Sequence, residues 1–237
     1  MIKGLLIFLV LSSTAMASYD QYKVNNFIDF MHSEHSYSKE NLKILFNEIK
    51  AEPRIKKYFK KAPERTLMWN GCKAEDKKCT NYKKLFVTKK NIEKGIIFWN
   101  KNKNALLRAE KKFGVPPEII IAIIGIESKY GLRTGTFKTF DTLASLSLGP
   151  NEGRRAKFYK DELINFLLMC RENKLDPRSI KGSYAGALGK PQFISSSYRH
   201  YAIDFNGDNV VDLWNSNEDV IGSVANYFKK NGWKNNQ

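Results

Sequence analysis

Cysteine is scarce in this chain of 237 residues, which contains only three. Cys72 and Cys79 enclose a short polar segment with no histidine nearby, and two thiols alone make a poor zinc site. An oxidising compartment would let these two cysteines pair as a disulfide. Cys170 follows the apolar residues 166–169, which predicts a buried and unreactive thiol.

The N-terminus has an apolar run, but a short one. Residues 5–11 fall well below the roughly 20 residues that a membrane span needs, which argues against a permanent anchor. Lys3 precedes this run and Ala15-Met16-Ala17 follows it, a pattern typical of a cleaved secretory signal. We therefore expect residues 1–17 to be a signal peptide and the mature protein to be periplasmic. No cysteine stands where a lipid anchor would start.

Acidic residues are few beside the basic ones, 24 against 40, so the formal net charge is +16. A basic surface favours an anionic partner. The excess is mostly lysine spread along the chain, so a compositional bias explains it equally well. No nucleic-acid-binding motif accompanies the charge, and we expect no nucleic-acid partner. The hydrophobic content of 42% is that of a globular protein and excludes wholesale disorder.

Helical periodicity dominates the sequence, and alternating strand-like runs are few. Helices are predicted around residues 27–31, 42–49, 89–113, 117–127, 141–146, 154–172 and 219–230. A glycine-rich loop covers residues 181–191. The expected fold is mainly helical with little sheet, and its length allows one domain or one domain with a small helical attachment.

Glu127 closes a continuous apolar run, residues 119–126, that predicts a helix buried on every side. Apolar surroundings and the negative end of the helix dipole both favour the protonated form of a carboxyl group. A general acid for glycosidic cleavage needs that form. A surface glutamate balanced by Lys129 or Arg133 is the alternative that position alone leaves open.

Residues 204–212 resemble the start of an EF-hand loop, with oxygen donors at alternate positions. The candidate calcium ligands are Asp204, Asn206, Asp208 and the carbonyl of Val210. Asn209 occupies the usual glycine position, however, and Asn215 stands where a glutamate is usual. A turn rich in Asp and Asn without a metal is therefore an equal alternative on this pattern.

Residues 114–120, followed by Gly125-Ile126-Glu127-Ser128 and Gly131, resemble the lytic murein transglycosylase B family, glycoside hydrolase family 103. Further segments agree in order: residues 98–99, 141–147, 154–156, 181–189, 191–193, 196–198, 202–205, 213–214 and 221–228. The likeness covers roughly residues 82–233, so it extends over most of the chain.

The resemblance implies an α+β, lysozyme-like, mainly helical fold and a peptidoglycan lytic transglycosylase with Glu127 as its single catalytic residue. Glu127 would first act as acid and then as base in cleaving the β-1,4 bond between N-acetylmuramic acid and N-acetylglucosamine, leaving 1,6-anhydromuramoyl ends. No second carboxylate is required, unlike in most glycosidases. Asp141, the tempting second acid, is interpreted as a helix N-cap.

The resemblance also implies ligand-binding residues. Ser183, Gln192, Tyr82 and Tyr227 match substrate-binding positions, and Asp219 matches the acidic residue that closes a longer calcium loop, residues 204–219, with Glu218 as its rival. The calcium would be structural, and no organic cofactor is expected. The partners would be peptidoglycan glycan strands and other cell-wall enzymes, and we expect a monomer.

The expected organisation is a signal peptide (1–17), an N-terminal helical segment with the cysteine loop (18–80) and a catalytic core (81–237). The chain also departs from the family. Relatives generally continue beyond the position of Lys230 and complete the groove there, and Ser195 replaces a common proline. These departures leave two alternatives open: a lysozyme-type muramidase that hydrolyses the same bond, and a catalytically weakened peptidoglycan-binding protein.

Overall fold

The computed structural model describes residues 19–49, 52–60, 67–68, 72, 79–149 and 155–234. The predicted signal peptide and the polar residues 73–78 between the two paired cysteines lie outside this part of the chain. Among the described residues, no helix combines the length and the apolar character that crossing a bilayer requires.

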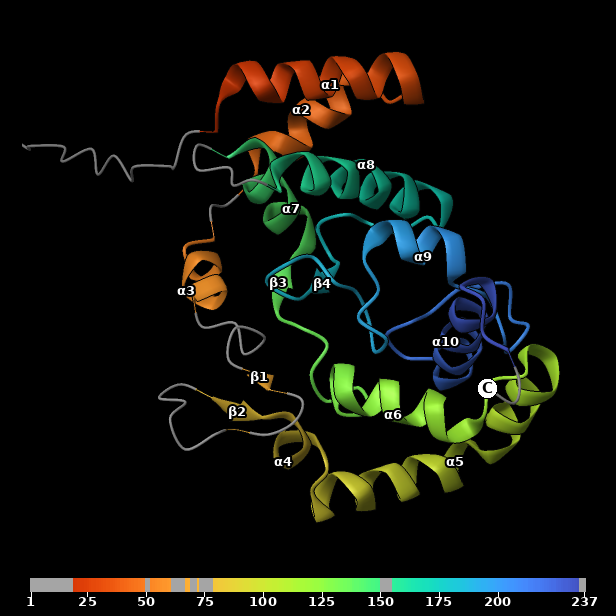
Figure 1. Cartoon of the computed structure of the whole chain (residues 1–237). Helices are drawn as coiled ribbons and strands as arrows, with labels where there is room; N and C mark the ends of the chain where they lie inside the picture. Colours follow the sequence, from red (N-terminus) through yellow and green to blue (C-terminus); the bar gives the residue numbers. More distant parts are fainter. Residues whose placement is uncertain are drawn as a thin grey trace, which may run out of the picture.

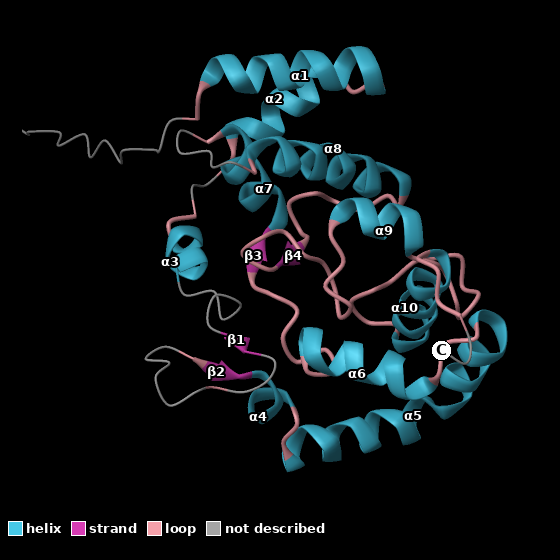
Figure 2. Ribbon diagram, viewed as in Figure 1, coloured by secondary structure: helices cyan, strands magenta, loops and turns pink. Residues whose placement is uncertain are grey.

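The described chain is predominantly helical, as predicted, with four strands of two residues each (Figures 1 and 2). The elements in order are α1 (Gln21–His35), α2 (Lys39–Asn47), α3 (Arg54–Lys60), β1 (Leu67–Met68), β2 (Thr80–Asn81), α4 (Tyr82–Phe86), α5 (Lys89–Phe113), α6 (Pro117–Ser128), β3 (Phe137–Lys138), α7 (Thr139–Leu148), α8 (Ala156–Glu172), β4 (Lys181–Gly182), α9 (Ser195–Tyr201) and α10 (Asn217–Lys230). β1 pairs with β2 in parallel, and β3 pairs with β4 antiparallel.

The helices form two groups that meet at α9 and α10 (Figure 1). One group contains α5, α6 and α10, which pack on one another, and the other contains α7, α8 and α9. α6 and the β3–β4 ladder therefore come from opposite groups and are joined by residues 129–136. This segment begins two residues after Glu127 in the sequence.

The N-terminal helices α1 and α2 pack against α7 and α8 instead of standing apart. The ring of Phe46 contacts that of Phe140 at 5.2 Å between centroids, and both side chains belong to the main hydrophobic core. The hydroxyl of Tyr37 donates to the carbonyl of Leu167 at 2.6 Å. Burial of these apolar side chains is the main stabilising term for such packing.

Short local signals explain where the helices near the site begin and end. Thr88 caps α5 by accepting a hydrogen bond from the amide of Asn91, and Gly114 ends the helix in the left-handed conformation. Pro117 opens α6, where a missing amide hydrogen costs nothing. Within α5, Asn102 has non-helical backbone angles, and its side chain donates to the carbonyl of Phe98 at 2.7 Å.

The cysteines behave as their sequence neighbours suggest. Cys72 and Cys79 are joined by a disulfide. Cys170 is a free, buried thiol in α8, as predicted, and burial raises its pKa to about 12. Three short helices, α3, α4 and α9, were not predicted, because five to seven residues are too few to show a helical period.

Candidate active site

Glu127 lies in the last turn of α6, but the surroundings of this helix differ from the prediction. Ile120, Ile121 and Ile124 are buried, whereas Ala122 is exposed and Ile123 and Ile126 are half-buried. Glu127 itself is exposed. The expectation of a helix buried on all sides was therefore wrong: one face of α6 is apolar yet open, which is the pattern of a helix that lines a hollow.

The end of α6 is shaped by backbone that turns into the left-handed region. Lys129, with a φ of 52°, is the C-cap of α6, and Tyr130 follows it with a φ of 61°. Such angles are uncommon for residues other than glycine and concentrate at functional sites. The Tyr130 ring lies against Gly95 and Gly125, where an added Cβ would meet its hydroxyl at 2.8 and 2.6 Å. Gly95 and Gly125 therefore leave the space that the Tyr130 ring occupies.

Glu127 shares a cavity of about 320 Å³ with two of the predicted substrate residues, Gln192 and Tyr227. We call it the Glu127 cavity. The remaining lining residues are mostly apolar: Ile123, Pro191, Phe193, Ile194, Ser197, Val224 and Phe228. Three segments distant in sequence, α6, residues 191–197 and α10, therefore converge on one carboxyl group.

Gln192 is held in a fixed pose beside Glu127. Its side-chain nitrogen donates to the carbonyl of Gly189 at 2.8 Å and to that of Thr134 at 3.2 Å. Its backbone is in the left-handed region, with φ of 52°. The amide thus ties the segment after α6 to the glycine-rich loop, and both contacts require a donor.

Tyr227 lines the cavity and packs with other aromatic side chains. Its ring lies 5.7 Å from that of Phe193 and 5.0 Å from that of Tyr201, measured between centroids.

α9, which carries Ser197, is anchored by the buried Glu162 of α8. That carboxylate accepts hydrogen bonds from the amide of Ser196 at 3.0 Å and from its hydroxyl at 2.6 Å. Sequence reasoning missed Glu162, because nothing near it in the sequence indicates its partner.

Ser183 and Tyr82 do not line the Glu127 cavity. The hydroxyl of Ser183 accepts hydrogen bonds from the amides of Ala185 and Ala187, at 3.2 and 3.0 Å, and so stabilises the glycine-rich loop. The ring of Tyr82 stacks on Phe86 with 4.6 Å between centroids. Phe86 lines a smaller hollow of about 180 Å³ on the face of α6 that carries Ile126.

Asp141, the other carboxyl group with a conceivable catalytic role, lies in α7 and not at the Glu127 cavity. It is the third residue of α7, not its N-cap, which is Lys138. It is buried, and its charge contributes to the raised pKa of Tyr19, which is caused mainly by burial and reaches about 12. Asp141 does not line the Glu127 cavity, so the described geometry offers it no catalytic role.

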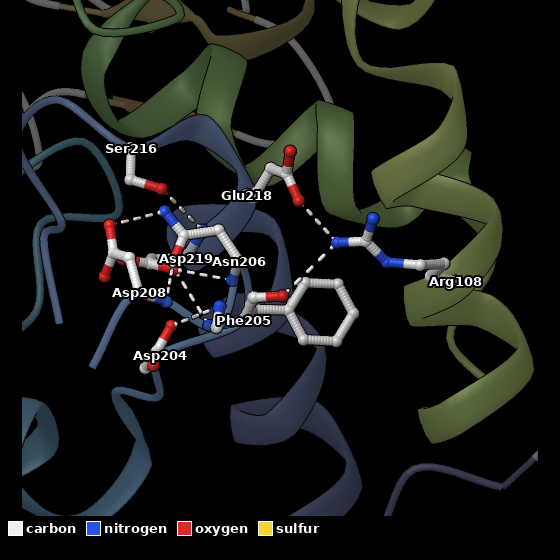
Figure 3. A network of polar contacts seen from close by, with 9 residues as sticks. Arg108, Asp204, Phe205, Asn206, Asp208, Ser216, Glu218 and Asp219 are labelled. Carbon is white, nitrogen blue, oxygen red and sulfur yellow. Dashed lines mark hydrogen bonds and ion pairs between the residues drawn. The ribbon is translucent and has the colours of Figure 1, made fainter. Parts of the chain in front are cut away.

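The loop after α9 is closed by Asp219 (Figure 3). This side chain is fully buried at the start of α10, and its two oxygens accept hydrogen bonds from the amides of Phe205, Asn206 and Asp212 at 2.8–3.2 Å. The rival residue Glu218 instead forms an ion pair with Arg108 of α5. The geometry therefore assigns the loop-closing position to Asp219.

The other candidate calcium ligands lie on the loop itself. Asp204 accepts hydrogen bonds from the amides of Gly207 and Asn209, and Asp208 accepts one from the amide of Val210. Asn209 has a φ of 68°, so it adopts the left-handed conformation for which an EF-hand uses glycine.

The loop therefore suits calcium in two respects: its candidate ligands are oxygen atoms, and its backbone makes the left-handed turn at Asn209. Among the described residues, however, no three carboxylate, histidine or cysteine side chains converge as they would around a bound ion.

The chain belongs to the family of transglycosylase SLT domains, which its residues 20–237 match. This confirms the family resemblance. The mainly helical, lysozyme-like fold class is confirmed by solved structures.

Soluble lytic transglycosylase SltB1 from Pseudomonas aeruginosa has a TM-score of 0.80 and 38% identity, covering 91% of this chain and 68% of that chain. The Escherichia coli lytic transglycosylase Slt35 in complex with calcium has a TM-score of 0.79 and 39% identity, covering 91% and 64%.

Among curated proteins, the membrane-bound lytic murein transglycosylase B of Escherichia coli K12 is 41% identical over 208 residues. The match covers 87% of this chain and 56% of that protein, so the chain spans little more than half the length of this relative.

Proposed function

We propose that this protein is a peptidoglycan lytic transglycosylase with Glu127 as its catalytic acid and base. One observation carries the proposal: in a member of the transglycosylase SLT domain family, Glu127 shares a cavity with Gln192 and Tyr227. An aromatic face beside a hydrogen-bonding amide suits a sugar ring, which has both apolar and polar edges.

The chemistry follows from one carboxyl group. Protonated Glu127 gives its proton to the glycosidic oxygen, and the bond from that oxygen to C1 of the muramoyl residue breaks. The resulting carboxylate accepts the proton of the muramoyl C6 hydroxyl, whose oxygen bonds to C1 and closes the 1,6-anhydro ring. No water is consumed and Glu127 ends protonated, so a second carboxylate is not required.

Because Glu127 is exposed, the bound substrate itself must shield the carboxyl group from water. Most of the lining of the Glu127 cavity is apolar, so a bound glycan would leave little room for water beside the carboxyl group. Excluding water strengthens the interactions of the acid with the departing oxygen. Gln192, held by two carbonyls, would orient the sugar, and Tyr227 would pack against its ring. Ser183 and Tyr82 are proposed to contact sugars further along the strand.

Mass spectrometry of digested sacculi tests the reaction. A transglycosylase leaves 1,6-anhydromuramoyl ends, which are lighter by one water than the reducing ends that a lysozyme-type hydrolase leaves. Reducing ends alone would establish the muramidase alternative. Retained binding to sacculi with no new ends of either kind would establish a peptidoglycan-binding protein without turnover.

We also propose that the loop of residues 204–219 holds a structural calcium ion. The ligands would be Asp204, Asn206, Asp208, the carbonyl of Val210 and Asp219. A related structure contains calcium, and the left-handed turn at Asn209 suits such a loop. Calcium at 100 times its dissociation constant would stabilise the fold by about 2.7 kcal/mol, or raise the melting temperature by about 5–10 °C.

Thermal unfolding in calcium and in chelator checks this, with Asp204→Asn as the variant that loses the effect. An equal melting temperature in both buffers would contradict a calcium site.

For localisation, we propose export to the periplasm through residues 1–17, action as a monomer, and glycan strands and other cell-wall enzymes as partners. The segment 18–80 and the core 81–237 remain our proposed division, although α1 and α2 share the main core.

A further inference from the structure

Lys190 is a half-buried lysine that comes directly before residues 191–193, which line the Glu127 cavity. Lys190 itself is not part of that lining. Burial lowers the pKa of its amine, although the nearby charge of Asp212 acts in the opposite direction. A lysine ammonium is seldom withdrawn from water unless protein groups accept its hydrogen bonds, so the partners of Lys190 indicate its role.

The amine and the backbone of Lys190 both bind the segment 213–217, which leads into α10. The side-chain Nζ donates to Oδ1 of Asn217 at 2.6 Å and to the carbonyl of Asn215 at 3.2 Å. The backbone amide of Lys190 donates to the carbonyl of Leu213 at 2.8 Å. Because Asn217 is the first residue of α10, these three hydrogen bonds join the loop after β4 to the start of that helix.

The methylene stem of Lys190 lies against the turn that follows Glu127. Gly131 has a φ of 89°, and an added Cβ there would stand 2.9–3.2 Å from three carbons of the Lys190 side chain. The amide of Gly131 donates to the hydroxyl of Ser128 at 2.9 Å, and Ser128 is the residue after Glu127. The contact therefore reaches from Lys190 to the last turn of α6.

The hydrogen bonds of Lys190 continue into α5 through Asn217. The side-chain nitrogen of Asn217 donates to Oδ1 of Asn102 at 3.2 Å, and buried Asn102 donates to the carbonyl of Phe98 at 2.7 Å. Linked polar side chains away from water favour one arrangement, because water cannot easily replace a lost partner. Lys190 is thus fixed relative to α5 and α10, which both pack on α6 (Figure 1).

We propose that Lys190 is a positioning residue for the reaction. Its amine and stem hold the loop that carries Gln192 in place relative to the turn after Glu127 and to the start of α10. Lys190 acts through these residues and not by contact with the glycan, because it does not line the Glu127 cavity. Its part in turnover rests on the proposed function, whereas its hold on Gln192 can be measured without turnover.

The kinetics of Lys190→Met test the proposal. The substitution keeps a stem of similar length and removes the amine. Lys101→Met, at an exposed lysine of α5, makes the same change of charge and is the matched control. At a temperature where both variants are folded, we expect Lys190→Met to lower kcat on sacculi by about tenfold, because a displacement of about 1 Å near a reacting group can cost up to a hundredfold in rate. KM should stay within about twofold, and Lys101→Met should change neither. Wild-type kcat in Lys190→Met, or a change confined to KM, would overturn the proposal.

A double-mutant cycle tests the pairing of Lys190 with Asn217. Asn217→Leu removes the side-chain acceptor of the amine and should lower kcat to a similar extent, which also provides the test from the other partner if Lys190→Met does not fold. The double variant should fall no further than either single variant, because each removes the same interaction. Falls that multiply in the double variant would show that the two side chains act independently and would contradict the proposal.

Hydrogen exchange of side-chain amides measures the position of Gln192 apart from turnover. The chain contains three glutamines, Gln21, Gln192 and Gln237, so ¹⁵N labelling of glutamine side chains gives few signals, and Gln192→Glu assigns one of them. We expect Lys190→Met to raise the exchange rate of the Gln192 amide by about tenfold and to leave that of Gln21 unchanged. An unchanged Gln192 rate would overturn the proposal. If the wild type makes no new glycan ends while the Gln192 rate rises in Lys190→Met, the proposed function fails and the hold of Lys190 on Gln192 stands.

Discussion

The side-chain amide of Gln192 donates to the carbonyl of Thr134, 3.2 Å away, and so joins the segment after Glu127 to the loop after β4. The same nitrogen donates to the carbonyl of Gly189 at 2.8 Å. One planar amide thus fixes the segment that follows Glu127 relative to the loop that carries Gln192 into the Glu127 cavity. The side chain at position 192 must donate both hydrogen bonds, because both partners are carbonyl oxygens, which can only accept.

Gln192→Glu should therefore impair turnover more than stability. The substitution keeps the size of the side chain but places acceptors against two carbonyls, losing two hydrogen bonds worth about 0.5–1.5 kcal/mol each. We expect kcat/KM on sacculi to fall by about tenfold or more. Gln21→Glu is the matched control, since Gln21 lies on the exposed face of α1. Equal activity of the two variants would show that the amide has no role.

Asp219→Asn should destabilise the protein by about 1–3 kcal/mol even without calcium. The carboxylate is buried and accepts from three backbone amides, and an asparagine nitrogen cannot accept. Glu218→Gln removes a neighbouring charge from an exposed ion pair and should cost no more than about 1 kcal/mol. Chemical denaturation in chelator measures both. A larger loss for Glu218→Gln would reverse the assignment of the loop-closing residue.

Ser195→Pro should stabilise the fold by about 0.4–1 kcal/mol. Ser195 is the first residue of α9, where proline is favoured, and its buried hydroxyl has no hydrogen-bond partner in the described structure. Ser196→Pro should do the opposite, because it removes the amide that donates to Glu162. The melting temperatures of the two variants, each compared with the wild type, test this prediction. A melting temperature of Ser195→Pro below that of the wild type would show that Ser195 is not the first residue of α9.

Sequence alone predicted α5 and α6 to within a residue, because their caps and apolar periods are strong local signals. It also singled out Gln192 and Tyr227, through the resemblance and not through any local pattern. The exposure of Glu127 was not predictable in the same way. A run of isoleucines indicates burial, and only the packed structure shows that Ile123 and Ile126 border hollows instead of neighbouring helices.

Contacts between distant segments account for the remaining differences. Glu162 caps α9 from α8, 34 residues away, and the pairing of Trp214 with the carbonyl of Lys181 spans 33 residues. Neither pair leaves a periodic trace in the sequence. Asp141 was misplaced for a simpler reason: α7 begins two residues earlier than expected, and helix ends are the least certain part of a sequence-based assignment.

The central claim is that one carboxyl group, Glu127, performs both proton transfers. The most direct measurement is the rate at which Glu127→Gln forms 1,6-anhydromuramoyl ends on purified sacculi, beside Glu118→Gln, an exposed glutamate in the first turn of the same helix. We predict a fall of about 10³-fold or more for Glu127→Gln and wild-type turnover for Glu118→Gln. Anhydro ends formed by folded Glu127→Gln at the wild-type rate would contradict the account.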